Sequence, residues 1–334
     1  MSKTFVCIGN TAIGAALSKS LVSAGYKAAG DLDLADVVLT FCTSQEALED
    51  VYFDTSGIIA KAQPGAFIID CSPTTPGFAK ELSAMAQVSD LHAVECPLYV
   101  RDIAAKDAFS NAGNLVALVS AEDDSDIEVV RPMIEAMAST VEICGRPGDA
   151  QLAKASLSLQ QAAAVMSMIE ALSLCRADSG AMKADDMARM ELRLEAVSPG
   201  MANLLVAIET ESFQGGNTVE VLMADLGAAL AAADDVDQIM PQAESAIYLF
   251  QLLATVGGMD KNPAALSLLY ADEATCAKHG LDWTRAEEAY ESMGHSGGHE
   301  HHHHDHNCDD DCDYDDDDED DDSFDGGFGG YSSN

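Results

Sequence analysis

Residues 4–14 read TFVCIGNTAIG and decide the fold of the first part of the chain. The apolar and β-branched start predicts a short buried strand that ends at Gly9. Apolar residues at helical spacing over residues 12–24 then predict a helix, which Gly25 closes. A strand, a tight turn and a helix in this order leave free backbone N–H groups at the helix N-terminus, where an anion can bind.

The turn itself is similar to a dinucleotide-binding loop. Such a loop uses three glycines, and Gly9 and Gly14 fill the first and third positions, whereas Thr11 stands in the second. The alternative is a tight turn kept only for helix packing. We predict that the cofactor-binding residues of this turn are Gly9, Asn10, Thr11, Ala12, Ile13 and Gly14.

The alternation of strands and helices continues to about residue 147. Further strands are predicted at 36–41, 66–70, 92–96, 115–119 and 140–144, with helices at 44–50, 76–85 and 126–137. Ser44 is the expected N-cap of the first of these helices, and Pro132 either kinks the last or marks its first turn. This alternation is typical of a parallel, doubly wound sheet.

The pattern then becomes helical, beginning with a long stretch from Asp149 to Ala177. Further helices are predicted at 184–197, 200–210, 217–232, 242–256, 263–270 and 284–293. From Gly294 the composition falls to His, Asp, Gly and Ser, which cannot bury enough apolar surface to order itself. We therefore predict an α/β domain over 1–147, an all-helical domain over 148–293, and a disordered His/Asp-rich tail over 294–334.

Charge and cysteine content restrict the function class. The formal net charge is −40, and the part before Glu300 is acidic as well, so binding to nucleic acid or to an anionic membrane surface is not expected. No uninterrupted apolar run reaches the roughly 18 residues of a membrane span, and no signal-like segment precedes the first strand. Seven of the nine cysteines are scattered singly, which is typical of reduced thiols in a cytoplasmic protein.

The tail concentrates metal ligands. Imidazole and thiolate groups suit Ni or Zn, and the neighbouring aspartates attract cations. The alternative is a low-complexity solubilising tail or a purification aid. The predicted ligands of divalent ions are His299, His301, His302, His303, His304, His306, Cys308 and Cys312.

Several segments match, in order, the motifs of one enzyme family. They are DCSPTTP at 70–76 for D-x-S-T-x-x-P, ECPLYVR at 95–101 for D-A-P-V-S-G-G, GNL at 113–115 for G-x-L, GRPGDAQLAK at 145–154 for G-x-x-G-x-G-x-x-x-K, and MADLG at 223–227 for K-D-L-G. With the opening strand, turn and helix, the chain resembles the β-hydroxyacid dehydrogenases. These include 3-hydroxyisobutyrate dehydrogenase and, more distantly, 6-phosphogluconate dehydrogenase and the imine reductases.

The resemblance implies hydride transfer between NAD or NADP and a small hydroxy acid, or its keto or imine counterpart. It also implies a homodimer that associates through the helical domain. Lys154 stands at the family's acid/base lysine, with Tyr99 and Arg101 as further catalytic candidates, since Arg101 could clamp a substrate carboxylate. The resemblance adds Thr43, Ser72 and Asp225 to the cofactor-binding residues.

The sequence also departs from the family. Tyr99-Val100-Arg101 replaces S-G-G, Leu157-Ser158 replaces the asparagine pair after the lysine, and Ala224 replaces the cofactor-contacting lysine. Only residues 27–35 lie between Tyr26, which follows the first helix, and the strand at 36–41, and nine residues are too few for a βαβ crossover. We predict at most one short strand beside Thr4–Ile8 on that side.

Two functions therefore remain open from the sequence. The first is a divergent NAD(P)-dependent oxidoreductase of small hydroxy acids or their keto or imine counterparts. The second is a catalytically inactive relative that serves as a dimeric scaffold with a metal-binding tail.

Overall fold

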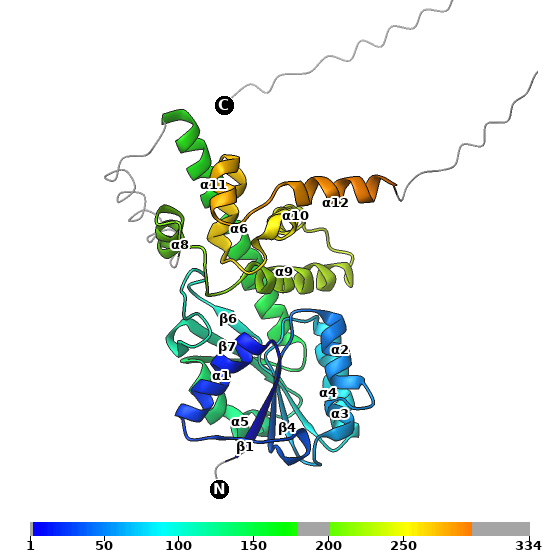
Figure 1. The fold of residues 1–334 in the computed structure, drawn as a ribbon. Helices are drawn as coiled ribbons and strands as arrows, with labels where there is room; N and C mark the ends of the chain where they lie inside the picture. The colour runs from blue at the N-terminus through cyan, green and yellow to red at the C-terminus, as the bar shows by residue number, and fades with distance from the viewer. Residues whose placement is uncertain (1–2, 180–200, 296–334) are drawn as a thin grey trace, which may run out of the picture. The chain divides into compact units, whose positions relative to one another are not determined.

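The computed structural model describes residues 3–179 and 201–295. Of these, residues up to Ser292 belong to one compact unit, in which a sheet flanked by helices is followed by helices alone (Figure 1). The strands are β1 (Thr4–Gly9), β2 (Lys27–Ala28), β3 (Val37–Phe41), β4 (Phe67–Asp70), β5 (His92–Glu95), β6 (Leu98–Val100), β7 (Leu115–Ala121) and β8 (Thr140–Gly145). The helices of this part are α1 (Thr11–Ser23), α2 (Gln45–Phe53), α3 (Ile58–Lys61), α4 (Pro76–Val88) and α5 (Asp124–Met137).

The sheet is parallel in its larger part. Its strand order is β2-β1-β3-β4-β5-β7-β6, and β8 pairs with β7 in addition. β2, β1, β3, β4 and β5 pair in parallel, so the Rossmann-type arrangement predicted from the sequence is confirmed. The carboxyl ends of β1, β3, β4 and β5 therefore meet at one edge of the sheet, where ligands bind in folds of this kind.

The last strands of the sheet depart from the parallel arrangement. β7 runs antiparallel to both β5 and β6, and β8 runs parallel to β7. The segment between β6 and β7 contains only a short 3₁₀ turn, Ala112–Asn114, and no crossover helix that could return the chain to the same end of the sheet. Leu98–Val100, which lies in none of the strands predicted from the sequence, is also a strand.

Helices cover both faces of the sheet. On one face α1 and α5 pack against the strands through apolar residues such as Leu17 and Ile134, and on the other α2, α3 and α4 do so through residues such as Leu48 and Leu82 (Figure 1). Ser44 caps α2 as predicted, since its hydroxyl accepts a hydrogen bond from the backbone of Ala47. Pro132 lies inside α5, so it does not mark that helix's first turn.

The edge of the sheet beyond β1 agrees with the prediction of at most one short strand there. β2 has two residues, and they pair with Thr4 and Phe5 at the amino end of β1. Among the described residues it is the only strand on that side of β1. The missing crossover is confirmed.

The rest of the unit is helical. It consists of α6 (Asp149–Ser179), α8 (Met201–Glu209), α9 (Val219–Asp234), α10 (Pro241–Leu253), a π-helical turn (Ala254–Gly258), a 3₁₀ helix (Pro263–Tyr270), α11 (Glu273–Lys278) and α12 (Thr284–His295). By length and composition Asp149–Leu174 of α6 could cross a membrane, although α6 packs against the sheet and against α9 and α10, as expected of a core helix. The helix predicted at 184–197 lies outside the described residues.

Candidate functional site

The glycine turn after β1 has the shape that a phosphate-binding loop needs. Gly9 has a φ of +109°, and a Cβ at this position would lie 2.1 Å from the carbonyl oxygen of Phe41. A Cβ on Gly14 would lie 2.9 Å from Cys7 Sγ, so this glycine lets α1 pack closely on β1. The structure therefore explains why glycine stands at both places, and phosphate binding by this turn stays a prediction.

The side chain of Asn10 closes the start of α1. Its Oδ1 accepts hydrogen bonds from the backbone N–H groups of Ala12 and Ile13, each at 3.1 Å. These amides are among those that an anion would meet at a helix N-terminus. A phosphate that bound to these two amides would compete with the Asn10 carboxamide for them.

The loops after β3 and β4 bring the other predicted cofactor residues to this edge. Thr43 donates its hydroxyl hydrogen to Glu220 Oε1 at 2.8 Å and so joins the sheet edge to α9. Ser72 is fully buried, and its hydroxyl accepts a hydrogen bond from the backbone of Cys42 at 3.0 Å. Burial raises the pKa of the neighbouring Asp70, whose carboxylate accepts from the Ser72 backbone. Thr43 is thus placed for a ligand, whereas Ser72 braces the loop.

A cavity of about 600 Å³ lies between these loops and the helical half. The loops supply mostly polar side chains to it, and α9 and α10 supply mostly small or apolar ones, together with Glu220 and Gln251. No described residue that lines it is Lys, Arg or His, and Glu220 is its one acidic side chain. Representative lining residues are Thr43, Gln45, Thr74, Glu220, Ala228 and Ile247. This mixture of apolar and uncharged polar lining is typical of small-molecule sites.

Lys154 and Asp225 form a buried ion pair. Lys154 Nζ lies 2.7 Å from Asp225 Oδ2, and the side chains are 7% and 3% exposed. Burial raises the pKa of Asp225, and the charge of Lys154 opposes this shift. The Tyr99 ring centroid lies 5.8 Å from Lys154 Nζ, and the Tyr99 hydroxyl accepts a hydrogen bond from Gln161. The structure therefore brings together Lys154 and Tyr99, which were predicted to be catalytic, and Asp225, which was predicted to bind the cofactor.

Arg101 lies elsewhere. Its guanidinium donates to the Thr140 hydroxyl at 2.8 Å, at the start of β8, and its side chain is exposed. Leu115, at the start of β7, pairs with the residue before Arg101. The structure does not bring Arg101 to Lys154 in the described state.

Two residues that the sequence analysis did not single out for a role fix the start of α6. The Glu95 carboxylate, at the end of β5, accepts hydrogen bonds from the backbones of Gly148 and Gln151 at 2.7 and 2.6 Å, and from the Ser120 hydroxyl. Burial raises the pKa of Glu95, and these hydrogen bonds oppose the shift. Gln151 donates its amide hydrogen to the Ser72 carbonyl at 2.9 Å. Together they hold the helix that carries Lys154 against the cofactor edge.

Comparison with known proteins agrees with this geometry. The family described as the NAD binding domain of 6-phosphogluconate dehydrogenase matches residues 7–145. The NAD-dependent L-serine dehydrogenase of Pseudomonas aeruginosa is 26% identical over 261 residues, which are 75% of this chain and 85% of that protein. The probable mitochondrial 3-hydroxyisobutyrate dehydrogenase of Dictyostelium discoideum is 23% identical over 235 residues, covering 68% of this chain and 71% of that one.

Over most of its length this chain is similar to β-hydroxyacid dehydrogenases, at low identity. The solved structure of the 3-hydroxyisobutyrate dehydrogenase of Mycobacterium tuberculosis with L-serine has the same fold, with a TM-score of 0.66 over 81% of this chain and all of that one, at 20% identity. Residues 7–145 are its NAD(P)-binding domain.

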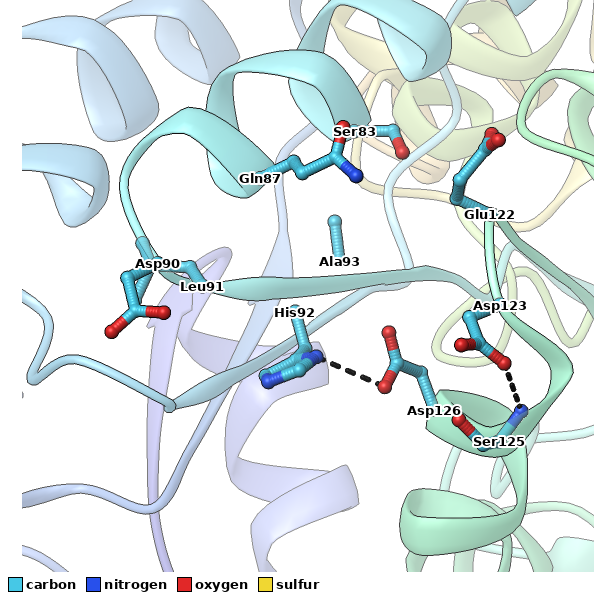
Figure 2. Close-up of a pocket in the computed structure, with 10 residues that line it drawn as sticks. All are labelled: Ser83, Gln87, Asp90, Leu91, His92, Ala93, Glu122, Asp123, Ser125 and Asp126. Atoms are coloured by element: carbon cyan, nitrogen blue, oxygen red, sulfur yellow. Dashed lines mark hydrogen bonds and ion pairs between the residues drawn. The ribbon is translucent and has the colours of Figure 1, made fainter.

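A second cavity, of about 300 Å³, lies away from the dehydrogenase site. Figure 2 shows His92 at the start of β5 facing Asp126, with Nδ1 and Oδ1 2.9 Å apart, and Asp123 capping α5 through the Ser125 backbone. This cavity lies at the amino end of β5, opposite the edge that carries Gly9. None of the predicted site residues lines it.

The predicted metal ligands lie outside the described residues. Within the described ranges, 3–179 and 201–295, no three His, Cys, Asp or Glu side chains come together as a metal site. A metal role for this protein therefore depends on the tail sequence alone.

Proposed function

We propose that this protein is an NAD(P)-dependent oxidoreductase that acts on a small hydroxy acid or on its keto or imine counterpart. The observation that carries the proposal is the buried pair of Lys154 and Asp225 beside the nucleotide-binding edge. A buried lysine with one fixed partner is expensive to maintain and is a common arrangement for a proton-transfer group. The retained pair gives no support to the alternative of an inactive scaffold.

Lys154 would act as the general acid and base. During reduction its ammonium donates a proton to the oxygen or nitrogen that develops charge, and during oxidation its amine removes the hydroxyl proton. Asp225 orients the ammonium through the 2.7 Å contact, and the Tyr99 ring limits its movement from another side. Ser158, one turn further along α6, is buried, and its hydroxyl interacts with the Asp225 carboxylate beside the Lys154 ammonium.

The residues at the sheet edge fit one part of the cofactor. Gly9, Gly14 and the amides of Ala12 and Ile13 would hold phosphate, and Thr43 with the 600 Å³ cavity would hold the nicotinamide end. The bound cofactor supplies or accepts the hydride. Glu95 and Gln151 would keep α6 in register with this edge so that Lys154 faces the reacting carbon.

The helical half would also form a homodimer. In Asp149–Leu174 of α6, 39% of the residues are buried, and Leu152 and Leu174 are 60% and 73% exposed. An apolar helix with a solvent-facing side favours a second copy of the same helix as its cover. A single copy seen by light scattering at micromolar concentration would contradict this part of the proposal.

The tail would bind divalent ions independently of the fold. Its ligands, His299 to Cys312, are consecutive and not spaced for one ion, which favours capacity over selectivity. Cutting the chain after Met293 should remove nearly all Ni or Zn binding and leave the melting temperature unchanged. Stoichiometric binding by the shortened protein would refute this assignment.

Steady-state kinetics test the dehydrogenase proposal. With NAD or NADP, a panel containing L-serine, 3-hydroxyisobutyrate and other small hydroxy acids should reveal turnover. Lys154→Met should lower kcat by about 100-fold or more, while Lys61→Met, on the exposed end of α3, should leave it unchanged. Melting curves identify variants that fail to fold, and Lys154→Arg keeps the charge if Met proves too disruptive. Unchanged turnover in a folded Lys154→Met variant would overturn the assignment of this residue.

A further inference from the structure

Among the described residues, only the two-residue strand β2 lies where a Rossmann domain carries its adenosine side. β2 ends at Ala28, and its last ladder partner is Phe5, with the Ala29 backbone donating to the Phe5 carbonyl at 2.7 Å. The phosphate turn at Gly9 begins four residues further along β1, which is about 13 Å away at the rise of a strand. In a complete Rossmann domain the second strand reaches the ribose of the bound dinucleotide. Here β2 therefore ends well short of the phosphate turn.

The short connection is held firmly at the amino end of the sheet. The Thr4 backbone and hydroxyl donate to Asp36 Oδ2 at 2.7 and 2.8 Å, and the Thr4 hydroxyl also lies 3.1 Å from the Leu34 carbonyl. The Gln63 amide donates to the Ala35 carbonyl at 2.9 Å. These contacts fix the segment that contains Asp31 and leave no slack for it to extend to the phosphate turn.

Asp31 and Asp33 are consequently too far from the phosphate turn to bind the ribose of a nucleotide held there. In a complete Rossmann domain an acidic residue at the end of the second strand binds the ribose 2′-hydroxyl, or a basic residue nearby accepts a 2′-phosphate. Asp31 and Asp33 follow β2 directly and precede β3, on the side of the sheet opposite the carboxyl edge. The segment between β2 and β3 offers no Lys or Arg either.

The edge of β1 on the side of β2 is also uncovered. Val6, Cys7 and Ile8 are only partly buried, whereas all five residues of β3, the neighbouring strand, are buried. No described strand covers β1 beyond Phe5 on that side. An adenosine placed there would find solvent where a complete domain offers a strand and a helix.

Resting on the dehydrogenase function proposed above, we infer that this protein holds its cofactor by the nicotinamide and phosphate half alone. Reduced nicotinamide mononucleotide is then a sufficient ligand, and the site does not distinguish NADH from NADPH. The ligand class is nicotinamide nucleotides, whatever group is attached to the phosphate of the nicotinamide half. The phosphate turn and the 600 Å³ cavity, which are retained, supply the contacts.

The test is calorimetric titration of the full-length protein with NADH, NADPH and reduced nicotinamide mononucleotide, supported by nicotinamide fluorescence. The three dissociation constants should fall within about tenfold of one another, which is about 1.4 kcal/mol. Binding of NADH more than about 100-fold tighter than the mononucleotide, or a preference of that size between NADH and NADPH, overturns the inference alone. Failure of all three to bind overturns both the inference and the proposed function.

Two variants provide matched controls within the chain. Asp31→Asn and Asp33→Asn should leave the ratio of NADPH to NADH affinity within about twofold, because neither carboxylate reaches the ligand. A tenfold shift towards NADPH in either variant would show that the carboxylate reads the ribose and would overturn the inference. The L-serine dehydrogenase of Pseudomonas aeruginosa, titrated in parallel, provides a comparison with a member of the family.

Discussion

Removing the Lys154 ammonium should destabilise the folded protein as well as lower its turnover. In Lys154→Met the aliphatic stem is kept, but the Asp225 carboxylate is left at 3% exposure without its counter-ion. Breaking a buried pair on one side costs about 3–5 kcal/mol, because the remaining charge is desolvated and unpaired. The free energy of unfolding of Lys154→Met should therefore fall by about 3 kcal/mol at pH 7.

The pH dependence has a definite sign. Burial raises the pKa of Asp225, and without Lys154 only the Ser158 hydroxyl is left to oppose this shift. A group with a raised folded-state pKa contributes stability that is present at low pH and is lost as the pH rises through that pKa. The deficit of Lys154→Met relative to the unmutated protein should therefore be smaller at pH 5 than at pH 8.

Urea unfolding followed by circular dichroism measures both effects. Adding Asp225→Asn to Lys154→Met should recover about 2 kcal/mol, since the unpaired charge disappears, while Lys61→Met should change stability by less than about 0.5 kcal/mol. A loss below about 1 kcal/mol in Lys154→Met, or a deficit that grows towards pH 5, would refute the reasoning that the pair is buried and charged.

Three further outcomes follow from the same contacts. Glu95→Gln should cost about 1–3 kcal/mol in urea unfolding, because an amide replaces one acceptor of the backbone donors at the start of α6; an unchanged midpoint would contradict this. Asn10→Ala should lower helix stability by about 1 kcal/mol yet tighten nucleotide binding several-fold in calorimetry, since Ala12 and Ile13 are freed; weaker binding would contradict the competition. Because burial raises the pKa values of Asp70, Glu95 and Asp225, these groups should add stability as the pH falls from 7 to 5.5, and a fall in unfolding free energy over that interval would count against it.

Local sequence determined the framework of the nucleotide domain. Gly9 and Gly14 are recognisable because the conformations they allow are local: one requires a positive φ and the other a close helix on a strand. The missing crossover was equally predictable, since nine residues between the first helix and the next strand set an upper limit on what can be built there. These features depend on chain length and backbone geometry, which a sequence states directly.

The tertiary structure alone decided how the site is assembled. Lys154 and Asp225 are 71 residues apart, and only the packing of α6 on α9 shows that they form a pair. Glu95 caps a helix that begins more than 50 residues later, and Arg101 turns to Thr140 and away from Lys154. The reversed direction of β7 also arises from a pairing between distant segments. Burial and charge pairing are properties of neighbours in space, and residue spacing along the chain does not specify which neighbours those are.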